Sequence, residues 1–409
     1  MEKVKDIVFV GLSPWFWEIG SNSKDIARVL SKQYRILYMN PPLDNRTVLE
    51  QRDHPEYRKY LEIISGKRPN LIEIEPNIWN YYPTKIITSA RWLPFTFLFS
   101  MVNRINNRRF ASDIRTATKL LGFSDYILLN DNDIFRSFYL KELLHPRLYI
   151  YYSRDNLVAM NYWKKHGLKL EPLHIAKADL AVANSLYLTD YLRRYNPNSH
   201  YVGQGCDIRV FDAAIDYPMP DDLKSIPHPI IGYIGAISSL RLDKAVIRGI
   251  AESRPHYNIV MVGPEDEDFI KSDLHSYPNI HFLGRKPLEE LPRYSSRFDV
   301  CINPQLLNEV TIGNYPLKID EYLAMGKPVV ATRTRAMELF GDSVFTAEKP
   351  ADYPGLLDKA LAEDTSMARE KRIALAHTHT WENSVRELLL AIENTLPNFS
   401  QKQTSGTPL

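Results

Sequence analysis

The 409-residue sequence has only two cysteines, Cys206 and Cys301, which excludes a disulfide framework and favours a reducing compartment. It has no Cys/His spacing of a zinc site, and the acidic residues at 130–133 lack the glycine and glutamate of a calcium loop. It also lacks an apolar run of the roughly 20 residues that a membrane span needs. No cleavable signal pattern opens the chain, so we expect a cytoplasmic protein that acts at the inner face of the membrane.

The composition is that of a folded protein, with 44% hydrophobic and 24% charged residues, and the length favours two domains. The net charge of +2 conceals an asymmetry between the two halves of the chain. Residues 1–200 carry 29 Lys and Arg against 20 Asp and Glu, whereas residues 201–409 carry 22 against 29. The basic half indicates a phosphate, an anionic lipid or a nucleic acid as partner, unless the charges are scattered over separate surfaces.

Strand-length apolar runs alternate with helical patterns, which indicates parallel α/β layers. In the first half, strands are expected at Ile7–Gly11, Tyr34–Met39, Tyr126–Leu129, Leu148–Tyr152 and Leu180–Ala183. After the proline-rich stretch Asp216–Pro229, they are expected at Ile230–Ile234, Asn258–Val262, Ile280–Leu283, Val300–Ile302 and Val329–Ala331. We therefore predict Rossmann-like domains at 1–209 and 210–380, a helix at 381–396 that returns to the first domain, and a flexible tail at 397–409.

The most informative local pattern is a helix that begins near Pro316 and ends at Gly326. A helix N-terminus attracts anions, and Lys318 in its first turn adds a full charge for a diphosphate. Glu321 lies about one turn further along, where its carboxylate could accept hydrogen bonds from ribose hydroxyls. Spacing alone leaves open the alternative of a Lys/Glu pair on an ordinary amphipathic helix.

A second pattern opens the C-terminal half, where an apolar run leads into Gly235 and then reaches Arg241. A glycine lets the backbone approach a phosphate, and the arginine lies within reach of it. Many strand–helix turns carry glycine for conformational reasons, so this pattern is weak when taken alone.

The sequence resembles GT-B glycosyltransferases, close to glycosyltransferase family 4 and similar bacterial surface-polysaccharide transferases. The matching segments occur in the order of that family over about residues 178–395. They are Ala178–Ser185, Gly205–Asp207, Gly232–Gly235, Val260–Pro264, Asn279–Arg285, Pro316–Val330 and the helix that starts at Trp381. The N-terminal half is similar only loosely, as is usual for acceptor-binding domains.

The resemblance implies an α/β fold of GT-B architecture, with two Rossmann-like domains facing across a cleft. It implies a hexosyltransferase-like enzyme that moves a sugar from a nucleotide diphosphate sugar to a saccharide or lipid-linked acceptor in cell-surface polysaccharide biosynthesis. Neither a catalytic metal nor another cofactor nor a nucleic acid partner is expected. Carried over by position, the donor-binding residues are Gly235, Ser238, Arg241, Gly284, Arg285, Asn303, Thr311, Asn314, Lys318 and Glu321.

One departure from the family pattern concerns two glutamates that have seven residues between them. Glu321 matches the second, but Gly313 occupies the position of the first, and Glu309 is out of register. The contact to the sugar and the retaining stereochemistry associated with that glutamate are therefore open. A degenerate scaffold that binds a nucleotide sugar or a partner enzyme, or a nucleotide-sugar epimerase, are the alternative functions.

The first half offers a candidate general base, Asp155, directly after the predicted strand Leu148–Tyr152. A carboxylate there could deprotonate an acceptor hydroxyl, although a helix cap is an equally ordinary use of aspartate. Asp131 and Asp133 form a competing acidic cluster at another strand end. A glycine loop with Gly20, Ser21 and Ser23 either faces the cleft or caps the following helix.

Residues 85–109 combine basic and aromatic side chains. This combination fits a lipid headgroup interface, in which rings are buried and cations meet anionic lipid. The residues assigned to membrane docking are Arg91, Trp92, Phe95, Arg104 and Arg108. The alternative is a core helix with a solvated basic end.

Overall fold

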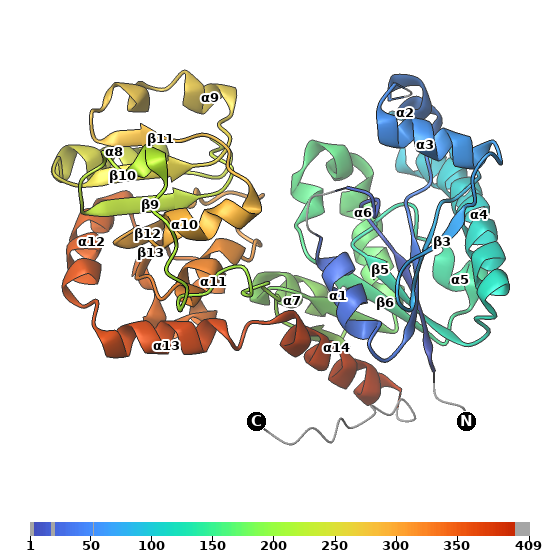
Figure 1. Ribbon diagram of the computed structural model, residues 1–409. Helices are drawn as coiled ribbons and strands as arrows, with labels where there is room; N and C mark the ends of the chain where they lie inside the picture. The colour runs from blue at the N-terminus through green and yellow to red at the C-terminus, as the bar shows by residue number, and fades with distance from the viewer. Residues whose placement is uncertain (1–3, 18–20, 52, 397–409) are drawn as a thin grey trace. The chain divides into compact units, whose positions relative to one another are not determined.

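The computed structural model describes residues 4–17, 21–51 and 53–396, and the chain divides into two compact units (Figure 1). Unit 1 comprises Met1–Gly203 and Ser384–Leu409, and unit 2 comprises Gln204–Asn383. The division falls after residue 203, whereas the sequence led us to expect it after residue 209. Gly20 and the tail at 397–409 lie outside the described residues.

Unit 1 is built on an eight-stranded sheet in the order β3-β4-β2-β1-β5-β6-β7-β8. All neighbours are parallel except β3, which pairs antiparallel with β4. The strands are β1 Asp6–Val10, β2 Arg35–Met39, β3 Leu71–Glu75, β4 Ile78–Tyr81, β5 Tyr126–Asp131, β6 Leu148–Ser153, β7 Leu180–Ala183 and β8 Ser199–Tyr201.

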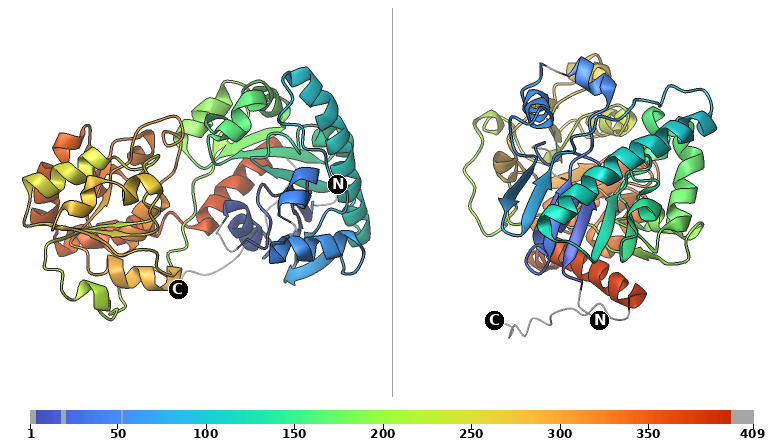
Figure 2. Two further views of the ribbon diagram at one scale, coloured as in Figure 1. Left: turned by 90° about the horizontal axis from the view of Figure 1, so that it is seen from above. Right: turned by 90° about the vertical axis from the view of Figure 1, so that its right-hand side faces the viewer.

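The helices of unit 1 include a C-terminal one from the far end of the sequence. They are α1 Asn22–Leu30, α2 Asn45–Glu50, α3 Pro55–Ile64, α4 Thr96–Leu121, α5 Leu140–Leu144, α6 Asn161–Lys177, α7 Leu186–Arg193 and α14 Trp381–Thr395. Asn198 beside β8 donates through Nδ2 to Thr395 Oγ1 at 3.0 Å, and Ser384 Oγ donates to Gly203 O at 3.2 Å. These bonds tie α14 to the end of the unit 1 sheet, beside which Figure 2 shows it.

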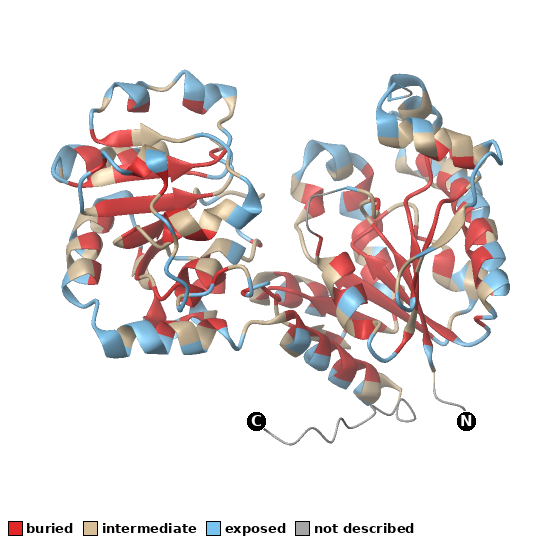
Figure 3. Cartoon of the chain, viewed as in Figure 1, coloured by how far each residue is buried: buried red, intermediate tan, exposed pale blue. Residues whose placement is uncertain are grey.

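Unit 2 is built on a six-stranded parallel sheet in the order β11-β10-β9-β12-β13-β14. The strands are β9 Ile230–Ile234, β10 Asn258–Val262, β11 Ile280–Phe282, β12 Val300–Asn303, β13 Val329–Thr332 and β14 Phe345–Ala347. Successive side chains of a strand point to opposite faces, and in β9 Ile230 and Ile234 enter one apolar core while Ile231 and Tyr233 enter another. Both faces of this sheet are therefore covered, and its strands are largely buried in Figure 3.

The helices of unit 2 are α8 Lys244–Ser253, α9 Glu267–Ile270, α10 Leu291–Ser295, α11 Leu317–Ala324, α12 Tyr353–Ala362 and α13 Ser366–Ala376. Helix α11 ends as the sequence predicts, because Gly326 adopts φ +69° just beyond it. Its apolar residues Ile319, Tyr322 and Leu323 are buried in the core on one face of the sheet. This packing fixes which side chains at the start of α11 point away from the core.

Candidate functional site

Two glycines bring the ends of neighbouring strands in unit 2 into direct backbone contact. Gly263 follows β10 with φ +153°, and a Cβ there would lie 1.8 Å from the carbonyl oxygen of Gly235. Gly235 N donates to Val262 O at 2.9 Å, and Gly263 N donates to Gly284 O at 2.9 Å. The loops after β9, β10 and β11 therefore meet at the carboxyl edge of the sheet, where α/β proteins bind their ligands.

Lys318 lies against the first of these loops. A Cβ on Gly235 would be 3.1 Å from Lys318 Cε and 3.4 Å from Lys318 Nζ, so the lysine occupies the space that this glycine leaves. The ammonium lies 5.0 Å from the centre of the Tyr233 ring, a cation–π contact. It forms no ion pair with any residue that the structure describes. A positive charge at a strand-end loop that forms no direct ion pair with a described residue can contact a bound anion.

Glu321 lies three residues further along α11 and is half-buried. Within the described parts of the chain, its carboxylate receives no hydrogen bond. Burial raises the pKa of this carboxyl from 4.5 to about 7, against the opposing effect of Lys318 and together with the repulsion from Asp320. A carboxyl that lacks donors and titrates near neutrality is typical of functional sites.

The neighbouring Asp320 points the other way, into the protein. It is fully buried, its Oδ1 lies 2.7 Å from His379 Nδ1, and the Tyr315 hydroxyl lies 3.1 Å from the same nitrogen. Burial raises the pKa of the Asp320 carboxyl. This contact anchors α11 to the segment before α14 and so positions Lys318 and Glu321, a role that no sequence pattern identified.

Arg241 and Asn314 were assigned to the donor from separate motifs, and the structure brings them together. With the Asn314 amide oriented so that its nitrogen donates to Val310 O at 3.2 Å, Arg241 Nη1 donates to its oxygen at 3.2 Å. The loop that carries Arg241 is closed locally, since Ser238 O accepts from Arg241 N at 2.9 Å. The guanidinium remains exposed.

Four other predicted donor residues differ in burial and in whether their polar groups already have hydrogen-bond partners. Thr311 is buried, and its hydroxyl donates to Leu306 O and accepts from Asn308 N, so it shapes its own loop. Asn303 is buried at the end of β12, and its carbonyl accepts from Tyr353 OH at 3.0 Å. Gly284 and Arg285 are exposed on the loop after β11. Donor contacts by these four residues stay predictions.

Gly313 and the nearby Glu309, the two residues considered for the first glutamate of the pattern, differ in exposure. Gly313, which stands where the family has that residue, is buried, whereas Glu309 is exposed on the preceding loop. The described structure therefore gives no substitute for the absent carboxylate at position 313.

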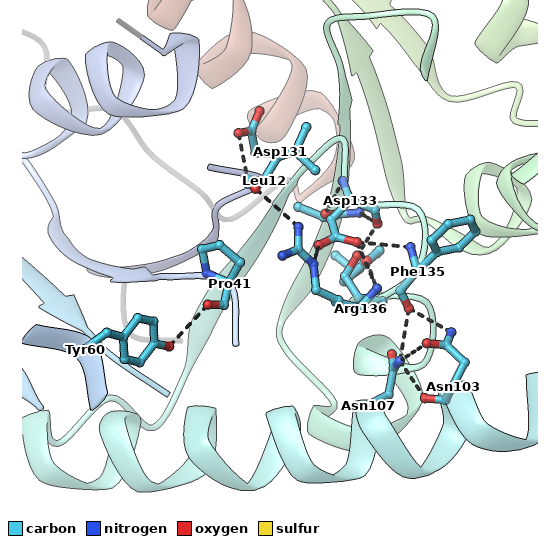
Figure 4. A network of polar contacts seen from close by, with 12 residues as sticks. Leu12, Pro41, Tyr60, Asn103, Asn107, Asp131, Asp133, Phe135 and Arg136 are labelled. Carbon is cyan, nitrogen blue, oxygen red and sulfur yellow. Dashed lines mark hydrogen bonds and ion pairs between the residues drawn. The ribbon is translucent and has the colours of Figure 1, made fainter. Parts of the chain in front are cut away.

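In unit 1, acidic residues gather at the carboxyl ends of β5 and β6. Asp131 is fully buried, lies 2.9 Å from Arg154 Nε and accepts from Leu12 N at 3.3 Å. Asp133 accepts from the backbone of its own turn and pairs with Arg136, which also donates to Leu12 O at 3.2 Å (Figure 4). Both carboxylates are therefore committed to structural contacts.

Asp155 is more exposed than Asp131 and Asp133, the other two strand-end carboxylates of unit 1. Its side chain is 45% exposed and lies 3.7 Å from Arg154 Nη1. The N-cap positions of the next two helical segments are occupied by Asn156 and Met160. Its role as base stays a prediction.

The glycine loop of unit 1 lies partly outside the described residues, because Gly20 does. Ser21 and Ser23 are buried, with 3.0 Å between their hydroxyl oxygens, and Ser23 Oγ lies 3.3 Å from Tyr38 OH. Ser21 stands at the N-cap of α1 but makes no side-chain capping bond. Both serines face inward in this structure, toward β2.

No group of three or more His, Cys, Asp or Glu in residues 4–17, 21–51 and 53–396 is arranged to hold a metal ion. In the same residues, no helix is both long enough and apolar enough to cross a bilayer.

Comparison with known proteins agrees with this architecture. Residues 228–362 match the family described as "Glycosyl transferases group 1". The chain is 26% identical over 249 residues to the putative teichuronic acid biosynthesis glycosyltransferase TuaH of Bacillus subtilis, a match that covers 58% of this chain and 62% of that protein. The chain thus matches somewhat less than two thirds of the length of this relative.

Solved structures share the fold over nearly the whole chain. A sucrose-phosphate synthase from Thermosynechococcus elongatus gives a TM-score of 0.65 at 14% identity, covering 96% of this chain and 99% of its own. HepE from Anabaena in complex with UDP gives a TM-score of 0.64 at 14% identity, and the match covers 96% of this chain and 100% of the HepE chain. These neighbours are GT-B proteins, so the predicted fold class is confirmed.

Proposed function

We propose that this chain, which carries a glycosyl transferases group 1 domain in unit 2, is a glycosyltransferase of cell-surface polysaccharide biosynthesis. It would move a sugar from a nucleotide diphosphate sugar to a saccharide or lipid-linked acceptor. The observation that carries the proposal is the pair formed by Lys318 and Glu321 at the strand-end loops. Among the described residues, Lys318 forms no ion pair and the Glu321 carboxylate receives no hydrogen bond. The name of TuaH and the UDP and UDP-glucose bound by HepE support it.

Each group of the site has a role in this proposal. The Glu321 carboxylate accepts hydrogen bonds from the ribose hydroxyls, which supply the donors that it lacks. Lys318 and Arg241 meet the diphosphate, and the absence of a side chain at Gly235 leaves the room in which Lys318 lies beside this loop. The leaving nucleoside diphosphate gains negative charge as the glycosidic bond breaks, and fixed cations beside it stabilise that charge without a metal.

The proposed reaction is a displacement at the anomeric carbon. A bond forms between that carbon and the acceptor oxygen, and the bond to the donor phosphate oxygen breaks. The hydroxyl proton passes to a carboxylate, for which Asp155 is the candidate. The enzyme would work on the cytoplasmic side of the membrane, where nucleotide sugars are its co-substrates.

Nucleotide binding tests the donor site directly. We expect one of UDP, GDP, ADP, CMP and TDP to raise the melting temperature, because a ligand at about 100 times its Kd adds about 2.7 kcal/mol to stability. Glu321→Gln should lower the affinity for that nucleotide at least tenfold, since the amide accepts hydrogen bonds from the ribose hydroxyls less strongly than the carboxylate does. Glu370→Gln, on an exposed face of α13, is the matched control and should leave the shift unchanged. A folded protein that no nucleotide stabilises would refute the proposal.

The pH dependence of binding should follow the Glu321 carboxyl, whose pKa is about 7. Only the ionised form accepts from both ribose hydroxyls, so we expect Kd to be about tenfold higher at pH 6 than at pH 8. The terminal phosphate of the nucleotide titrates in the same range and also makes the Kd depend on pH. The Glu321→Gln variant should keep the pH dependence that the phosphate causes and lose the part that Glu321 causes. Calorimetric titration at three pH values measures the difference, and parallel profiles for the two proteins would contradict this role.

A further inference from the structure

The described surface of unit 1 carries a cluster of large apolar side chains that the transfer chemistry does not use. Trp92, Phe95, Phe97, Met101 and Ile105 are each at least half exposed, all within fourteen consecutive residues. Isolated exposed apolar residues are ordinary, but contiguous ones mark an interaction site. We infer that this cluster docks unit 1 on an anionic lipid bilayer.

Helix α4 has two distinct faces at its N-terminal half. Phe99, Asn103 and Phe110 are buried toward the protein. The opposite face carries residues at intervals of three and four, which line up along one side of a helix. These outward residues are Phe97, Met101, Arg104, Ile105 and Arg108. Apolar side chains and arginines therefore share a single exposed stripe.

Helix α6 extends this surface beside the start of α4. Arg91 lies over the Tyr162 ring, with its guanidinium carbon 4.0 Å from the ring centre. Lys165 Nζ donates to Trp92 O at 3.2 Å, and the rings of Phe99 and His166 stack at 4.4 Å. The large apolar side chains that are exposed in residues 160–169 are Met160, Tyr162 and Leu168. We call the outward residues of 91–108 and 160–169 the α4–α6 surface.

The charge of the α4–α6 surface identifies its partner. Residues 76–112 and 156–170 contain no Asp or Glu. Of the eight cationic side chains in these ranges, six belong to the α4–α6 surface, namely Arg91, Arg104, Arg108, Lys164, Lys165 and Lys169. Apolar and aromatic side chains that enter the headgroup layer, bordered by cations of one sign, are the features by which a surface helix binds anionic lipid.

Among the described residues, Arg104 and Arg108 form no ion pair with an acidic side chain, and acidic lipid headgroups would supply counter-charges to both. The inference goes beyond sugar transfer and does not depend on it. It assigns to the helices of unit 1 a second binding surface, separate in the sequence from the donor residues.

Co-sedimentation with vesicles tests the inference. The full chain should bind vesicles of phosphatidylcholine with 30% phosphatidylglycerol, and bind pure phosphatidylcholine at least tenfold more weakly. Added salt should weaken binding, because it screens exposed charges. The double variants Phe97→Ser with Met101→Ser and Arg104→Glu with Arg108→Glu should each lose at least tenfold in affinity.

The matched control replaces an exposed methionine and lysine of α13, as Met367→Ser with Lys371→Glu, and should bind vesicles like the wild type. Circular dichroism and thermal unfolding of every variant report that the chain, including unit 1, is folded. Equal sedimentation with and without vesicles, or variants that bind like the wild type, would overturn the inference. Concentration-dependent dimerisation that the Phe97 and Met101 substitutions abolish, without vesicle binding, would assign the surface to a second copy instead.

Discussion

Replacing Lys318 with alanine is expected to lower kcat/KM for sugar transfer by about 10²–10³-fold, the range for removing one group that stabilises transition-state charge. The lysine fills the space beside Gly235 and has no counter-ion among the described residues, so no other group there holds its charge in place. Release of nucleoside diphosphate measures the loss. Lys318→Arg should recover part of the rate, and Lys371→Ala on α13 should be unaffected.

Two further observations separate the roles of Lys318. Its charge lowers the pKa of Glu321, so its removal should also shift the pH dependence of nucleotide binding toward higher pH. An unchanged kcat with a raised KM would show that the lysine binds donor and transition state equally.

A wild-type protein that binds nucleotide but transfers no sugar to any acceptor would favour the alternative of a degenerate scaffold, which Gly313 left open.

Most of the strands that sequence reasoning identified are central strands that parallel pairing buries on both faces. β9 and β10 read as continuous apolar runs, and the structure has them at Ile230–Ile234 and Asn258–Val262, as expected. The hairpin of β3 and β4 was missed because β3, Leu71–Glu75, is a half-exposed edge strand with alternating polarity. Asn77, with φ +62° at its turn, was the available signal.

The sequence predicted the relative placement of candidate site residues only where they lie on one helix, because spacing along a helix determines which side chains share a face. Lys318 and Glu321 share the exposed side of α11 because they are three residues apart. The inward contact of Asp320 with His379 joins residues 59 positions apart, which no local pattern encodes. Thr311 looked like a polar ligand in the sequence, but the fold of its loop occupies its hydroxyl.

The Glu321 carboxyl also makes folding depend on pH. Its pKa is raised on folding, so between about pH 4.5 and 7 the native state keeps a proton that the unfolded chain has released. Stability from this group is therefore present below that window and lost as the pH rises through it. In the proposed complex, the ribose hydroxyls would donate to the ionised carboxylate and so offset this loss of stability.

The largest effect on folding is expected from Gly263→Ala, which should destabilise unit 2 by about 2–4 kcal/mol. The added Cβ would lie 1.8 Å from Gly235 O, and φ +153° is a conformation that alanine rarely adopts. The loop after β9 must then move, which breaks the bond from Gly235 N to Val262 O and displaces the wall against which Lys318 lies. Stability and nucleotide affinity should therefore fall together.

Urea unfolding followed by circular dichroism, with hydrogen exchange of β9 and β10 to locate the change in unit 2, measures this effect. Gly249→Ala in α8 is the matched control, because nothing lies within 4 Å of its Cβ position. That substitution should be neutral or add about 0.5–1 kcal/mol, since alanine favours a helix interior over glycine. If Gly263→Ala unfolds at the same urea concentration as the wild type, the two strand-end loops do not depend on each other, and the close approach of Gly235 and Gly263 is not what holds the proposed donor site together.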